Sequence, residues 1–119
     1  MARLVIKITS GAEALERCNQ GWTVATAAMA AGVETSVWLT GDAVWFATPG
    51  YADSVELEGA QSFSFAVAEI LAQGTLTACT QCLRRRNIEP EQVLPGVRVA
   101  GAMGFVEEVM VPEAKALVY

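Results

Sequence analysis

Short apolar runs alternate with longer segments of helical periodicity along this chain, and this alternation constrains the fold more than any other feature. Strand-like runs occupy residues 4–9, 35–40, 75–78, 97–100 and 114–119. Helices are expected between them, over residues 10–32, 62–73, 80–86 and 101–111. Strands that alternate with helices predict a mostly parallel sheet with helices on both faces and right-handed crossovers. The predicted fold is therefore a three-layer α/β/α sandwich.

The length and composition predict one domain that associates with copies of itself. At 119 residues the chain is long enough for one hydrophobic core, so a single domain over residues 1–119 is expected. Apolar residues make up 53% and charged residues 18%, which indicates that part of the surface is buried in an oligomer.

The sequence predicts no membrane span. Its longest apolar stretch, residues 24–33, is much shorter than the roughly 20 residues that cross a bilayer. The first residues also lack the pattern of a secretion signal. We therefore expect the chain in the cytoplasm, where cysteines stay reduced.

Charge and residue inventory exclude several classes of function. The net charge is −5, and the one basic cluster, residues 84–86, has no aromatic residues near it, so nucleic-acid binding is not expected. The chain has no histidine, which is the commonest general base and the commonest metal ligand. Three cysteines without histidine also make a closed zinc site within one chain unexpected. We expect no metal and no cofactor.

Several local signals predict where the elements begin and end. Ser10 and Glu13 have the spacing of a capping box before the first helix, and Asp42 can cap a short helical turn. Residues 51–59 are polar and bounded by glycine, which predicts a link without regular structure. The last helix is expected to be built on the apolar residues Met103, Phe105, Val106, Val109 and Met110.

Trp45 and Phe46 lie just after the second predicted strand, in a segment too apolar to be an isolated exposed loop. The favoured interpretation is that they belong to the core or to a subunit interface. The alternative is a hydrophobic wall around a functional site, which would also suit an oligomeric module that binds a small molecule.

Two cysteines, Cys79 and Cys82, directly follow the third predicted strand. In parallel α/β sheets, functional sites lie beyond the carboxyl ends of the strands. Thr80 is a candidate N-cap for a short helix, and Asn87 tolerates the left-handed conformation that ends one. A sulfur near the start of a helix is more easily ionised, and the thiolate is the reactive form. Cys79 and Cys82 are therefore the candidate catalytic residues.

The residues alone leave three interpretations of this pair open. One accessible thiolate could carry sulfur as a persulfide, which requires no metal, nucleotide or histidine. Cys79 and Cys82 also have CxxC spacing, which suits a thiol–disulfide or peroxide-responsive redox protein. Both could instead be buried and inert, as we expect for Cys18 on the apolar stripe of the first helix.

Three stretches of the chain match one family pattern in combination. Residues 8–11 lead from the first strand into an Ala-rich helix, and residues 41–44 form a turn after an aromatic-rich second strand. The third strand ends in Cys79, and seven residues later comes Arg86, followed by Asn87 where the family usually has glycine. With these features the chain resembles the DsrE/DsrF-like family of small intracellular sulfur-relay proteins over nearly its whole length.

The resemblance implies a flavodoxin-like fold, assembly into trimers or hexamers, and a cysteine that carries sulfur as a persulfide between donor and acceptor proteins. By the family motif, the carrier position falls on Cys79. Cys82 matches a second cysteine that only some family members have, and its role stays open.

Overall fold

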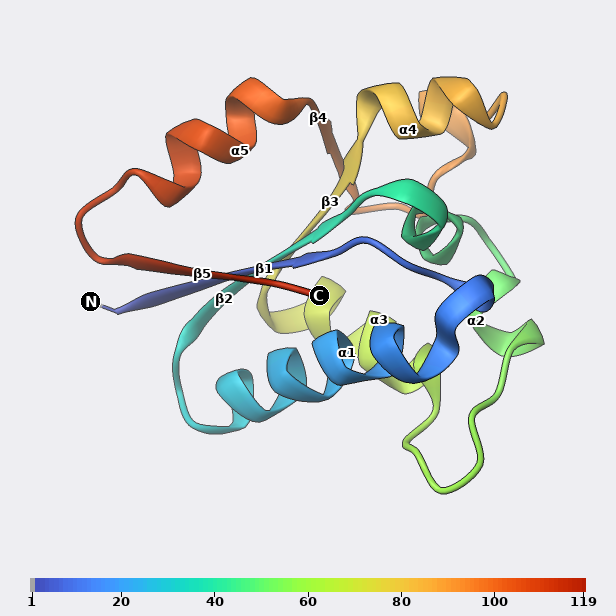
Figure 1. Cartoon of the computed structure of the whole chain (residues 1–119), viewed down its shortest axis with the longest axis horizontal. Helices are drawn as coiled ribbons and strands as arrows, with labels where there is room; N and C mark the ends of the chain where they lie inside the picture. The colour runs from blue at the N-terminus through green and yellow to red at the C-terminus, as the bar shows by residue number, and fades with distance from the viewer. Residues whose placement is uncertain (1) are drawn as a thin grey trace.

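The computed structural model describes residues 2–119 and is built around one five-stranded sheet (Figure 1). All neighbouring strands are parallel, in the order β4-β3-β2-β1-β5. The strands are β1 (Arg3–Ile8), β2 (Glu34–Leu39), β3 (Thr75–Cys79), β4 (Arg98–Ala100) and β5 (Ala114–Val118). Every predicted strand is present, with its ends within one residue of the prediction.

Helices cover both faces of the sheet and make three layers. The longest two, α1 (Leu15–Ala30) and α3 (Phe63–Gln73), pack side by side on one face, and α5 (Ala102–Val109) lies across the other (Figure 1). The short helix α4 (Thr80–Arg85) begins where β3 ends and packs against the 3₁₀ segment η2 (Gly41–Ala47). The remaining elements are η1 (Ala12–Ala14), α2 (Tyr51–Ser54) and η3 (Pro90–Gln92). The architecture is the predicted flavodoxin-like α/β fold.

The main core lies between the sheet and the layer formed by α1 and α3. Alternate residues of the inner strands point into it, as expected for strands that are buried on both faces. Its largest side chains are Trp22, Phe46, Phe63, Ile6, Ile8, Leu39, Ile70, Leu76 and Leu83. Close packing in this core explains the glycine at position 21, because a Cβ there would lie 2.6 Å from Cγ1 of Ile8. Helix α1 can therefore approach β1 closely only with glycine at this position.

Three boundary predictions are wrong. Glu13 accepts a hydrogen bond from the Gly11 amide at 2.6 Å, so it does not form the predicted capping box with Ser10, and α1 begins only at Leu15. Asp42 lies inside η2, whose N-cap is Thr40, and its carboxylate binds an arginine instead. The segment 51–59 is not wholly irregular, since α2 forms in its first half.

Candidate functional site

Cys79 occupies the junction between β3 and α4. It is the last residue of β3, pairs with Ala100 of β4, and has the extended backbone angles of an N-cap, φ −69° and ψ 124°. The predicted N-cap, Thr80, is instead the first residue of α4. The side chain of Cys79 is partly exposed. This residue therefore places a sulfur that solvent can reach at the carboxyl edge of the sheet.

Cys82 lies one helical turn further along α4 and is only 7% exposed. Its Sγ accepts a hydrogen bond from the Gly41 amide at 3.2 Å and lies 3.8 Å from Nη1 of Arg85. Burial raises the pKa of the Cys82 thiol, and the neighbouring Cys79 raises it further. The Gly41 amide and Arg85 favour the thiolate but do not outweigh these effects. Cys82 is therefore a protonated thiol at neutral pH.

The three arginines after the cysteines have different surroundings. Arg86 places Nε and Nη2 at 2.8 and 2.7 Å from Oδ1 of Asp42, and its Nη1 donates to the Cys82 carbonyl oxygen at 3.0 Å. Arg85 approaches the sulfur of Cys82, as described above, and Arg84 is exposed. The arginine side chains thus do more than complement the negative end of α4, because two of them contact Cys82 directly.

The segments that follow β1, β2 and β3 converge at one edge of the sheet. Gly41 has φ +55°, and a Cβ on it would lie 2.6 Å from the carbonyl oxygen of Thr9. A Cβ on Gly11 would lie 2.6 Å from the carbonyl oxygen of Asp42. These contacts hold the start of η2 between the β1 loop and α4, where the Gly41 amide meets Cys82. Glycine is needed at position 41 for both its conformation and its closeness to β1.

Helix α4 ends as the sequence predicts. Asn87 has φ +56°, its amide donates to the Arg84 carbonyl at 3.1 Å, and the Ile88 amide donates to the Leu83 carbonyl at 3.0 Å. This is the hydrogen-bond pattern of a Schellman motif, and the buried side chains of Leu83 and Ile88 accompany it. The motif fixes where α4 stops and therefore where Arg86 stands relative to η2.

Cys18 lies in the main core, as predicted, with no exposed surface. Burial raises the pKa of its thiol to about 12. It is therefore a packing residue and has no access to a reaction partner.

Of the two aromatic residues after β2, Phe46 is the core residue that the sequence predicts. It is fully buried, with ring centroids 5.6 Å from Trp22 and 5.2 Å from Phe63. Trp45 is half-buried and stacks on Tyr51 at 6.2 Å. Phe46 therefore packs η2 against the core, and Trp45 packs it against α2.

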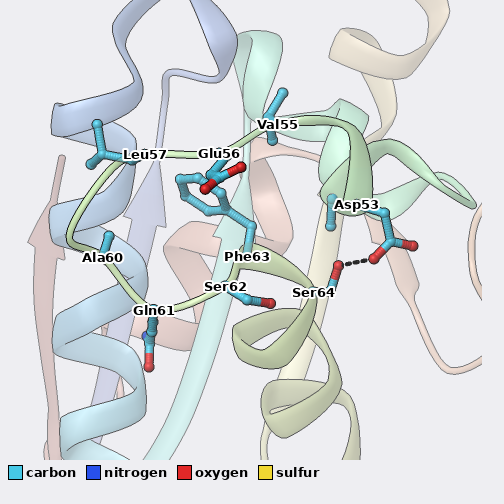
Figure 2. A pocket seen from close by; sticks show the side chains of 10 residues that line it. Asp53, Val55, Glu56, Leu57, Ala60, Gln61, Ser62, Phe63 and Ser64 are labelled. Atoms are coloured by element: carbon cyan, nitrogen blue, oxygen red, sulfur yellow. Dashed lines mark hydrogen bonds between the residues drawn. The ribbon is translucent and has the colours of Figure 1, made fainter.

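A pocket of about 240 Å³ lies between α2 and the start of α3, and its lining comes entirely from residues 52–64 (Figure 2). The carboxylates of Asp53 and Glu56 stand on its wall, and Ser64 donates a hydrogen bond to Asp53. The cysteines and Trp45 belong to other parts of the fold. This pocket therefore gives no support to a small-molecule site built on Trp45.

A buried carboxylate that the sequence analysis missed lies under α5. Glu108 accepts hydrogen bonds from Nη2 of Arg98 at 2.7 Å and from Nε1 of Trp38 at 3.2 Å, with Arg3 nearby. Burial alone would raise the pKa of Glu108, but the Ser36 hydroxyl, Arg98 and Trp38 favour the carboxylate and lower it overall. One sequence signal pointed to this position, because Glu108 follows Phe105 by three residues and so shares its helix face.

The apolar residues on which the sequence builds α5 are divided between its two sides, since Phe105 and Val109 are partly buried and the other three are exposed. The large apolar side chains exposed on this helix and directly after it are Met103, Val106, Met110 and Val111, at 79%, 54%, 73% and 39%. The apolar stripe of α5 points outward, and its inward face carries Phe105 and Glu108.

Comparison with known proteins shows which family this chain belongs to. The model of the DsrE/DsrF-like family matches residues 2–109. Among solved structures, the ychN protein from E. coli is similar with a TM-score of 0.83 at 16% sequence identity, over 100% of both chains. MTH1491 from Methanobacterium thermoautotrophicum, described as a protein of unknown function, is similar with a TM-score of 0.74 at 20% identity, also over 100% of both chains. No curated protein sequence matches significantly. The chain belongs to the DsrE/DsrF-like family.

Proposed function

We propose that this protein is a sulfur-relay protein of the cytoplasm that carries sulfur as a persulfide on Cys79. The observation that carries the proposal is the contrast among the three cysteines. Cys79 is partly exposed at the carboxyl edge of the sheet, whereas Cys82 and Cys18 are buried and have raised pKa values. Membership in a family of sulfur-relay proteins supports the same assignment.

The proposed reaction is an exchange between sulfur atoms that needs no oxidant or reductant. The Cys79 thiolate attacks the outer sulfur of a persulfide on a donor protein. A new S–S bond forms at Cys79, the S–S bond of the donor breaks, and the donor cysteine leaves as a thiolate with the electron pair. An acceptor thiolate then removes the outer sulfur from Cys79 by the same exchange.

The test is intact mass spectrometry after incubation with a cysteine desulfurase and cysteine. The parent protein should gain one sulfur atom that reduction removes. Cys79→Ser should gain none, and Cys82→Ser should load like the parent. Loading that survives in Cys79→Ser would contradict the proposal, as would a parent that never gains sulfur.

The second candidate function is a thiol–disulfide redox protein, and one observation favours it. Cys79 and Cys82 stand three residues apart at the start of α4, and Cys79 raises the pKa of the Cys82 thiol, so the two side chains interact. In that case the oxidised parent should contain an intramolecular Cys79–Cys82 disulfide, and Cys82→Ser should lose the disulfide and the activity together. Sulfur loading that persists in Cys82→Ser decides against this candidate.

We also propose that the protein forms a homo-oligomer, a trimer or hexamer as the family resemblance implies, and that the outward stripe of α5 lies in its interface. A helix that buries a carboxylate and exposes methionine and valine has the reverse of the usual polarity of a surface helix. On β5, the edge strand, Val118 is exposed on the same face of the sheet, because it pairs with Lys7, which lies over Phe105 of α5. The side chains of the stripe are themselves uncharged, and a second copy offers the same apolar surface.

A further inference from the structure

Arg86 joins two segments that are far apart in the sequence. Its guanidinium binds Oδ1 of Asp42 through Nε and Nη2, at 2.8 and 2.7 Å, and donates to the Cys82 carbonyl oxygen through Nη1 at 3.0 Å. All three guanidinium nitrogens thus bind a partner, and the side chain is 22% exposed. Arg86 therefore connects α4, which carries both site cysteines, to the start of η2.

The residue before Asp42 is the one that contacts the buried sulfur. The Gly41 amide donates to Sγ of Cys82 at 3.2 Å. On its other side, Gly41 lies so close to the carbonyl oxygen of Thr9 that a Cβ would be 2.6 Å from it. The start of η2 is therefore held between the β1 loop and α4, and the Arg86–Asp42 ion pair holds it on the α4 side.

Cys82 needs to be held because it stands beside the proposed sulfur carrier. If the Cys82 thiolate attacked a persulfide at Sγ of Cys79, a Cys79–Cys82 disulfide would form. The outer sulfur would leave as hydrosulfide with the electron pair, so the Cys82 sulfur would be oxidised and the outer sulfur reduced. The carried sulfur would then be lost before it reached an acceptor.

We infer that Arg86 and Asp42 are positioning residues that keep the start of η2, at Gly41 and Asp42, closed over Cys82, so that this cysteine cannot discharge a persulfide on Cys79. The inference rests on the proposed function of Cys79. Opening of η2 would expose Cys82 to water, which removes the burial that keeps it a thiol. The ion pair thus keeps Cys82 an unreactive thiol beside the reactive Cys79.

The first measurement uses the unloaded protein and is independent of sulfur transfer. Rates of iodoacetamide alkylation are measured separately at Cys18, Cys79 and Cys82 by peptide mass spectrometry. Arg86→Gln and Asp42→Asn should each raise the rate at Cys82 by about three- to tenfold, because the closed state of η2 is weakened. Arg84→Gln is the matched control, since it removes the same charge from an exposed position on the same helix, and it should leave the rate at Cys82 unchanged.

A double variant tests whether the two residues act through one contact. Arg86→Gln combined with Asp42→Asn should expose Cys82 no more than either change alone, whereas independent effects would multiply. Cys18 reports on the whole fold, because it has no exposed surface. Unchanged alkylation of Cys82 in both single variants, or equal acceleration at Cys18 and Cys82, would overturn the inference.

The second measurement uses the persulfide-loaded protein. Arg86→Gln should release hydrosulfide faster than the parent and accumulate the Cys79–Cys82 disulfide, and Cys82→Ser in the same background should abolish both changes. Release that stays at the parent rate while Cys82 becomes accessible would also overturn the inference. A parent that never loads sulfur would refute the proposed function, while the alkylation rates would still decide whether the ion pair shields Cys82.

Discussion

The three cysteines differ in burial, and the two buried ones have raised pKa values. Desolvation disfavours the charged form of a thiol, so it raises the pKa of Cys18 to about 12 and also raises the pKa of Cys82. Cys79 keeps contact with solvent because it stands at the point where a strand becomes a helix. A residue at this junction can present its side chain at the sheet edge without opening the core. Burial also acts on the carboxylate of Glu108, but there the hydrogen-bond donors outweigh it and lower the pKa.

Glu108→Gln should lower the free energy of unfolding at pH 7 by about 1–2 kcal/mol, because Arg98 and Arg3 lose their charged partner. The pKa of Glu108 is lower in the folded protein than in the unfolded chain, so its contribution is fully present above the unfolded pKa of about 4.3. It is lost as the pH falls through the lower, folded pKa. The difference between parent and variant should therefore shrink between pH 7 and pH 2.

Urea unfolding of both proteins at several pH values checks this prediction. Glu107→Gln is the control, because Glu107 is the neighbouring carboxylate on the same helix and is exposed. It should change stability little at any pH. A loss in Glu108→Gln that is the same at pH 2 and pH 7 would contradict the assignment of a lowered pKa.

At the scale of single elements, α4 shows how a short helix is stabilised by its ends and its neighbours. Six residues are too few for an isolated helix in water. Its start continues directly from β3, its end is closed by the Schellman motif at Asn87, and Arg86 binds it to η2. Contacts at its two ends therefore stabilise this helix. A substitution at Asn87, which has the left-handed conformation, should destabilise the segment that carries both cysteines.

Asn87→Ala should destabilise the protein by about 1 kcal/mol, whereas Asn87→Gly should be neutral or slightly stabilising. The reason is the φ of +56°, which costs alanine more than asparagine and costs glycine almost nothing. Thermal unfolding followed by circular dichroism gives both values. Gln81→Ala, an exposed change within the same helix, should have little effect. Equal losses for alanine and glycine at position 87 would show that the asparagine side chain, not the backbone conformation, is what matters.

At the scale of the whole molecule, the two faces of the sheet are covered unequally. Two long helices cover one face, whereas the other has the short helix α5, whose outward side is apolar (Figure 1). Exposed apolar surface of this extent usually marks an interaction site. The chain has 53% apolar residues, and the thinner layer on the α5 face leaves part of them exposed in a single copy of the protein.

The parent protein should elute as a trimer or larger species at micromolar concentration, measured by light scattering. Met103→Glu and Met110→Glu should shift it toward smaller species, because each places a charge in the proposed interface. Phe65→Glu is the control, since Phe65 is also an exposed apolar residue but lies on α3, over the opposite face of the sheet. A monomeric parent would refute the oligomer, and dissociation by Phe65→Glu alone would move the interface to the other face.

Most of the fold could be predicted from the sequence, because its signals are local. The short apolar runs mark all five strands to within one residue, and Asn87 marks the end of α4. The errors fall where a side chain bonds to another partner than the cap that its spacing predicts. Asp42 pairs with the distant Arg86 and does not cap its own turn, and Glu13 accepts from the Gly11 amide and not from that of Ser10. Local propensity cannot foresee such contacts, since their energy depends on which segments the fold brings together.

By itself, the sequence determined the α/β class, the strand order along the chain, and the position of Cys79 and Cys82 after the third strand. These follow from periodicity and from short-range backbone preferences, which act within a few residues. Only the tertiary structure decided that Cys82 is buried against Gly41, that Arg86 closes η2 over it, and that α5 turns Glu108 inward and its methionines outward. Burial and ion pairing depend on which distant segments meet. The two cysteines therefore look equivalent in the sequence and differ only once the chain has folded.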